Sequence, residues 1–166
     1  MSTSLWPERP IEQARLLNPA FLASLIWACA DGYGSVNEQG MPYPLLFVAM
    51  PVILHKVTRE NLPRSISTSL AAWIGENPHV HVRFTERAIS LVPLLKEGVL
   101  FGANGQIIEV SNSFIIAAPR PRTMTRFLAQ SSDEVRTCML KAKFVGKWFA
   151  SNGDYVTVMA LWGVAP

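Results

Sequence analysis

The stretch MPYPLLFVAMPVILHKVTRENLP, residues 41–63, decides how the rest of the chain must pack. Residues 45–54 within it include no polar side chain. A helix over this part would be apolar on every side, and such a helix has to lie inside a domain rather than on its surface. We therefore expect a buried central helix over about 44–57, bent at Pro51 because proline cannot donate a backbone hydrogen bond.

The length and composition of the chain indicate one domain that works as a subunit. A chain of 166 residues can bury a sizeable core. It is 49% hydrophobic but only 16% charged, against a usual charged fraction of about 25%. A monomer with so few charges exposes much apolar surface, so we expect partner proteins to cover part of it.

Three patterns in the sequence indicate where the protein is located. The longest apolar run is interrupted by prolines and falls short of the ~20 residues that a membrane span needs, and residues 1–10 lack the apolar stretch of a signal peptide. Cys29 and Cys138 both lie in apolar helical patterns, which is typical of buried thiols in a reducing compartment. We expect a cytoplasmic protein.

The first half of the chain predicts helices. Pro10 and Pro19 each suit the first turn of a helix, and Asn18 is a good N-cap for a helix over 19–30. After the central helix, Ser65 or Ser67 can cap a short helix through Ile74. We expect a further helix over 78–100, kinked at Pro93. We favour this helix over a strand at 79–84 because Asn77-Pro78 is typical of a helix start.

A hairpin follows these helices. The β-branched runs 106–110 and 113–117 are separated by two turn residues. The expected class is therefore mainly α with a small β-hairpin (α+β), and the order helix, helix, helix, hairpin is typical of a winged-helix-like domain.

The last third predicts a connection and one long helix. We expect residues 123–130 to be extended after the Pro-Arg-Pro-Arg tract, and Ser131 with Glu134 to form a capping box for a helix near 132–150. One face of that helix is apolar, comprising Val135, Cys138, Met139, Ala142, Val145 and Phe149. Residues 155–162 fit a strand or a buried helix equally well.

The residues that could support catalysis are few. No phosphate-binding loop is present, and His79 and His81 have no cysteine or carboxylate cluster at a zinc-like spacing. We expect no metal, no cofactor and no enzyme activity. His55, Lys56 and Arg59 could together bind an anion, but we favour a helix C-terminus, where cations interact well with the helix dipole.

The positive charge of the chain is concentrated near its end. Residues 119–150 hold seven basic and two acidic residues, and the whole net charge is +3. The candidate contact residues are Arg120, Arg122, Arg126, Arg136, Lys143 and Lys147. They could follow a DNA backbone or dock onto an acidic protein partner, and these two interpretations stay open.

Several motifs together resemble one family. They are Asn18-Pro19-Ala20-Phe21, Gly32-Tyr33, Leu54-His55-Lys56-x-Thr58-Arg59-x-x-Leu62-Pro63, Arg87-Ala88, Leu100-Phe101-Gly102, Gly146-Lys147-Trp148-Phe149-Ala150 and Leu161-x-Gly163-Val164-x-Pro166. The chain resembles the middle component of bacterial three-component ABC systems, and it looks like the small C subunit of Lamassu-type antiviral operons. A basic residue is expected in the closing motif, where this chain has Ala165.

The resemblance implies a non-enzymatic adaptor. In such systems an SMC- or Rad50-like ABC ATPase senses foreign DNA, an effector, often a nuclease, does the damage, and the middle component joins them. His55, Lys56, Thr58 and Arg59 become candidate partner contacts, and double-stranded DNA could be reached through the complex. The alternative is a free-standing winged-helix DNA-binding protein.

Overall fold

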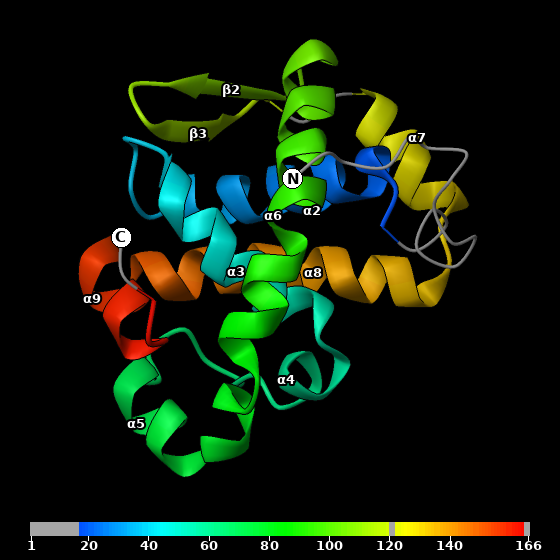
Figure 1. Ribbon diagram of the computed structural model, residues 1–166. Helices are drawn as coiled ribbons and strands as arrows, with labels where there is room; N and C mark the ends of the chain where they lie inside the picture. Colours follow the sequence, from blue (N-terminus) through cyan, green and yellow to red (C-terminus); the bar gives the residue numbers. More distant parts are fainter. Residues whose placement is uncertain (1–16, 120–121, 165–166) are drawn as a thin grey trace.

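A computed structural model describes residues 17–119 and 122–164, and this part of the chain is mainly helical (Figure 1). The helices are α2 (Pro19–Gly34), α3 (Leu46–Leu54), α4 (Lys56–Glu60), α5 (Leu70–Glu76), α6 (Phe84–Asn104), α7 (Arg122–Gln130), α8 (Asp133–Ala150) and α9 (Tyr155–Leu161), with short 3-10 turns η2 (Tyr43–Leu45) and η3 (Pro78–His81). The strands are β1 (Met41–Pro42), β2 (Ile108–Ser111) and β3 (Phe114–Ala117). The expected α+β class is confirmed. The helix expected from Pro10 lies outside the described residues.

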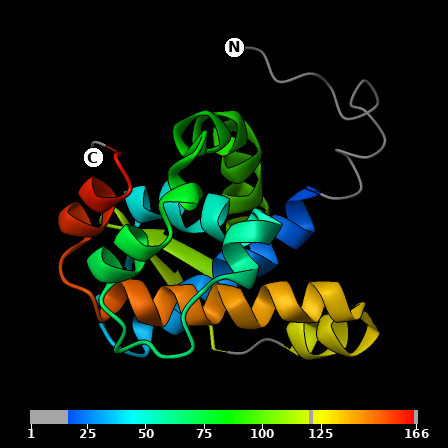
Figure 2. The same cartoon turned by 90° about the horizontal axis from the view of Figure 1, so that it is seen from below.

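Two buried helices lie between two outer ones. Helices α2 and α3 both pack against α6 on one side and against α8 on the other (Figure 2). The expected buried helix is present as α3, with Pro51 inside it. It ends earlier than predicted, at Leu54, because His55 adopts an extended backbone. Helix α2 is buried continuously from Leu22 to Ala30, so it shares the central position that we expected of α3 alone.

Glycine lets α2 and α8 touch through their backbones. A Cβ atom on Gly146 would lie 2.0 Å from the carbonyl oxygen of Cys29, and one on Gly32 would lie 2.1 Å from that of Lys143. Real side-chain atoms cannot come so close. The two helices therefore cross at a distance that only glycine allows at these positions.

The predicted hairpin is confirmed and has a third strand. β2 and β3 pair antiparallel, and Asn112 and Ser113 at the turn both have positive φ, as a two-residue hairpin turn of the primed type requires. β1 pairs with the other side of β3, which gives the order β1-β3-β2. Four helices, α3 to α6, precede the hairpin instead of the expected three, because the predicted central helix is divided into α3 and α4 at His55. A winged-helix domain stays a prediction.

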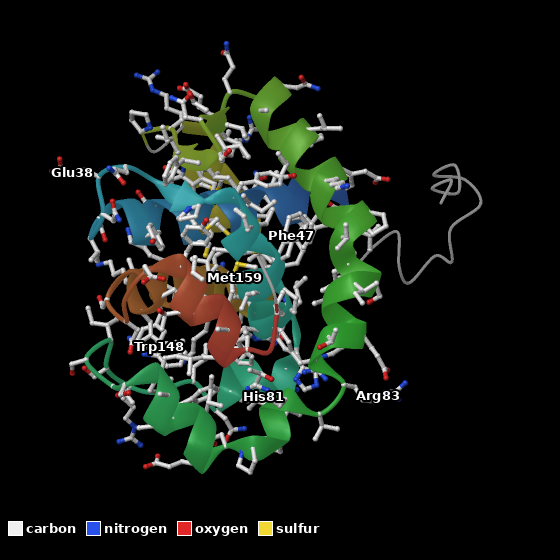
Figure 3. All side chains as sticks on the ribbon, turned by 60° about the vertical axis from the view of Figure 1, so that its left-hand side comes forward. Glu38, Phe47, His81, Arg83, Trp148 and Met159 are labelled. Carbon is white, nitrogen blue, oxygen red and sulfur yellow. The ribbon has the colours of Figure 1, made fainter. Side chains whose placement is uncertain are left out.

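Helix α6 begins later than predicted. Residues 78–81 form the 3-10 turn η3, and Arg83 then takes a left-handed conformation with φ of 55°, so the expected continuous helix over 78–100 is wrong at its start. From Phe84 the helix continues to Asn104 with Pro93 inside it. Arg83 projects away from the body at this break (Figure 3).

Residues 123–130 are helical, so the expected extended connection is wrong. Met124 is buried, and Phe127 and Leu128 pack against the core. These positions have helical spacing, and their burial stabilises α7 once the rest of the core is in place. Arg120 and Pro121, which prompted the prediction, lie outside the described residues.

The caps of two helices differ by one or a few residues from those predicted. Ser132, not Ser131, caps α8 by accepting from the backbone N–H of Val135, while the Ser131 hydroxyl donates to the carbonyl of Phe127. Ser69 caps α5, whereas Ser65 and Ser67 bond to each other through their hydroxyls at 2.7 Å. Residues 155–161 form a helix, α9, which Asp154 caps.

Candidate interaction site

His55 separates α3 from α4 and caps the second helix. Its Nδ1 lies 2.7 Å from the hydroxyl oxygen of Thr58 and accepts the Thr58 backbone N–H at 3.4 Å. A ring nitrogen that accepts cannot carry a proton, so the cap requires the neutral imidazole. Burial lowers the pKa of His55, and the positive charges of Arg87, Arg59 and His79 lower it further. The environment and the hydrogen bonds thus favour the same neutral form.

Arg59 is buried and ties three helices together. Its guanidinium donates to the carbonyl of Ile53 at 2.8 Å and to that of Leu54 at 3.5 Å, both at the end of α3. It also forms an ion pair with Glu134 in the first turn of α8. Because these carbonyls have no partner within α3, Arg59 supplies the hydrogen bonds that a helix end needs. The structure places Arg59 at a joint of the core, 5% exposed.

The other residues of this segment divide between core and surface. Thr58 is 1% exposed and Leu62 is buried. The carbonyl of Asn61 accepts from the indole N–H of Trp73 at 3.0 Å. Lys56 is exposed and pairs with Glu60 at 3.8 Å, a contact that contributes little in water. Of the four candidate contact residues, Lys56 is therefore the one that presents its charge to solvent.

Two further motifs also lie in the core. Trp148, inside the molecule in Figure 3, is fully buried and donates its indole N–H to the carbonyl of Thr68 at 2.7 Å. At the C-terminal motif, Trp162 is buried and stacks on His81 with ring centroids 5.3 Å apart, and Gly163 follows with φ of 71°. A left-handed residue directly after a helix is best filled by glycine. Ala165 lies outside the described residues.

The basic candidates lie on α7 and α8. Arg122 and Arg126 are exposed on α7, while Lys147 is partly buried on α8. Arg136 bonds to Asp133 at 2.6 Å, and Lys143 bonds to Asp31 of α2 at 2.7 Å. Arg120 lies outside the described residues. Arg136 and Lys143 are brought together on one wall of a groove.

This groove, the α8 groove, has a volume of about 430 Å³. It is lined by Trp27, Ala28 and Asp31 of α2, Leu128 of α7, and Arg136, Met139, Leu140 and Lys143 of α8. Sequence reasoning missed Trp27 and Leu140 as site residues. The sequence does contain a feature that could have identified Leu140: it is an apolar residue between Arg136 and Lys143 on the basic face of a helix.

A second surface lies on the outer side of α6. Ile89, Pro93 and Leu100 follow each other there at helical spacing, and Ile89 and Leu100 are 66% and 63% exposed. The opposite side of the same helix carries buried Leu95 and Gly102. We call this stripe of residues 89, 93 and 100 the α6 face.

The described residues show few features that could bind a metal or act as a nucleophile. Over residues 17–119 and 122–164, no group of three His, Cys, Asp or Glu side chains is placed to hold a metal ion. Both thiols are free and buried, and burial raises the pKa of Cys29 to about 12 and also raises that of Cys138. In the same ranges, every helix is too short or too polar to cross a membrane.

The comparison with protein families covers almost the whole chain. Residues 6–166 match the family described as ABC-three component (ABC-3C) system Middle Component 3. No curated protein and no solved structure matches the chain. A match of this extent shows membership, and the chain belongs to the Middle Component 3 family of ABC-three component systems.

Proposed function

We propose that this middle component is a non-enzymatic adaptor that joins an SMC- or Rad50-like ABC ATPase to an effector, often a nuclease. The proposal places it in a bacterial anti-phage or anti-plasmid defence complex of the Lamassu type. Membership of a three-component system supports a role in which the chain binds other components.

One observation carries the proposal: the chain has two separate exposed surfaces, the α6 face and the α8 groove. The α6 face is on α6, whereas the α8 groove is lined by α2, α7 and α8, and the helices α6 and α8 pack on different sides of α2 and α3 (Figure 2). A protein that joins two partners needs two separate surfaces. Exposed apolar side chains such as Ile89 and Leu140 are also what protein interfaces bury.

A DNA-binding protein on its own is the alternative, and α6 argues against it. In a winged-helix protein, the helix before the hairpin reads the major groove with polar and basic side chains. On the outer side of α6, Lys96 is the one basic residue among apolar Ile89, Pro93 and Leu100. These side chains suit a protein partner better than base edges and phosphates.

The test is co-expression with the proteins encoded beside this chain, followed by mass measurement of the purified complex. We expect one complex that contains the chain, the ATPase and the effector, and no ATP hydrolysis or DNA cleavage by the chain alone. Ile89→Glu should remove one of the two partners and leave the other bound, because it puts a charge into the α6 face. Val156→Glu, at an exposed position of α9, is the matched control. A wild-type chain that binds neither neighbour would overturn the adaptor proposal.

A further inference from the structure

We propose that the α8 groove binds an acidic amphipathic helix of one of the two other subunits. The inference rests on the proposed adaptor function and specifies the kind of segment that one partner presents. It is carried by the shape of the groove, by one exposed leucine and by the charge around them.

The shape of the groove fits a short helix. Its α8 wall consists of Arg136, Met139, Leu140 and Lys143, at spacings of three, four and seven residues from the first. Seven residues of helix extend about 10 Å, so the groove can take about two turns of a partner helix. α2 and α7 provide the remaining walls through Trp27 and Leu128.

The inner surface of the groove is apolar. Trp27 donates its indole N–H to the carbonyl of Ala118 at 2.9 Å, so this polar atom is already satisfied and the ring remains as an apolar contact. Met139 and Leu128 lie beside it among the lining residues. A partner would therefore gain by inserting apolar side chains, which is how a helix binds in a groove.

Leu140 is the most informative residue of this surface. It is 72% exposed, more than any other large hydrophobic residue in the described ranges. It lies on α8 between Arg136 and Lys143, which are both charged. An isolated leucine on a basic face has no role in the fold, and a partner that buries it would gain from removing it from water.

The charge around the groove selects an acidic partner. Helices α7 and α8 carry six basic residues and two acidic ones. The carboxylates of Asp133 and Asp31 already pair with Arg136 and Lys143. Arg126 of α7 and Lys147 of α8 are not lining residues, but among described residues no carboxylate forms an ion pair with either, so their charge adds to the attraction of these two helices for an acidic partner.

A DNA backbone would also be attracted to these charges, but it explains less of the surface. Phosphates bind through Lys, Arg and N–H donors, so they would leave Leu140 and the apolar floor without a contact. An amphipathic helix with acidic flanks satisfies both the apolar floor and the basic rim.

The test measures binding of the purified chain to the ATPase and to the effector encoded beside it, at low and high salt. The variants are Leu140→Glu, Leu140→Lys and Leu140→Ala, with Val156→Glu as control. Leu140→Glu should weaken binding to one subunit by about tenfold or more, because the new charge is repelled by an acidic partner. Leu140→Lys should weaken it less, and binding of the wild type should fall with salt. The thermal midpoint of each variant should match that of the wild type, since Leu140 is exposed.

Three results would overturn the inference while leaving the adaptor function intact. They are unchanged binding of Leu140→Glu to both subunits, an equal loss for Leu140→Lys and Leu140→Glu, or a loss of binding to a short DNA duplex with unchanged subunit assembly. The last result would make the groove a nucleic-acid surface. If the wild type binds neither subunit, the adaptor function fails first and the inference fails with it. If a charged variant is unfolded, Leu140→Ala is the deciding variant. A several-fold loss of its affinity for one subunit supports the inference, and unchanged affinity for both subunits overturns it.

Discussion

Arg59 and Glu134 form an ion pair that joins α4 to the first turn of α8, although 75 residues separate them in the chain. The arginine is buried and its carboxylate partner is largely exposed, with 6% and 64% of the side chains accessible. Arg59 uses its other donors on the last carbonyls of α3. The 54–63 segment therefore contains a residue that holds three helices together.

Replacing Arg59 by Ala should destabilise the protein by about 2–3 kcal/mol, because buried carbonyls of α3 lose their donor. Urea unfolding followed by circular dichroism measures this. Glu134→Gln is the control and should cost about 1 kcal/mol or less, since the exposed side chain keeps an oxygen that can accept. A mutant Arg59→Ala as stable as the wild type, but unable to assemble with its partners, would instead assign Arg59 to an interface.

Gly146→Ala should disrupt the crossing of α2 and α8. The added methyl group would clash with the carbonyl of Cys29, and neither backbone can move without separating the helices. We expect a loss of at least about 3 kcal/mol or an insoluble protein. Gly75→Ala is the matched control, because a Cβ there meets nothing within 4 Å and Gly75 lies inside α5. That variant should gain about 0.5–1 kcal/mol from reduced chain entropy. Equal thermal midpoints for the two variants would contradict the backbone contact.

His55 should make stability depend on pH. Its pKa is below the ordinary value of 6.5 in the folded protein, so the unfolded chain binds more protons in the window just below 6.5. Stability is then fully present above that value and falls as the pH is lowered toward the folded-state pKa. His55→Asn keeps an N-cap that can accept from Thr58 but cannot titrate. Denaturant unfolding from pH 7.5 to 5 should show a smaller loss for this variant than for the wild type, and parallel curves would show that His55 does not titrate differently on folding.

Neither thiol should react in the folded protein. Cys29 and Cys138 are free and buried, and a raised pKa leaves little thiolate at neutral pH. Ellman's reagent should label no cysteine in native buffer and both in guanidinium chloride. Rapid labelling of one cysteine under native conditions would mean that α2 or α8 opens easily.

Some of this protein follows from its sequence alone. The apolar run at 45–54 requires a buried helix, Asn18-Pro19 starts α2, and two β-branched runs around Asn112-Ser113 make a hairpin. These features depend on residues close together in the chain, so periodicity and turn chemistry are sufficient to predict them. The buried face of α8 was predictable for the same reason.

Other features depend on partners distant in the chain. Glu134 matches a capping box locally, but it forms an ion pair with the distant Arg59, and Ser132 caps α8 by accepting from Val135. Residues 155–161 fit strand or helix by pattern, and burial of Val158 and Met159 accompanies the helix. α7 forms on a core that only the folded chain provides.

The candidate site shows the same division. The basic residues of α7 and α8 and the 54–63 motif are visible in the sequence. Their roles are not, because burial decides that Arg59 and Thr58 belong to the core while Lys56 faces solvent. The α8 groove exists only where Trp27, Leu128 and Leu140 from three helices come together, since a groove is a property of packed surfaces and not of any one segment.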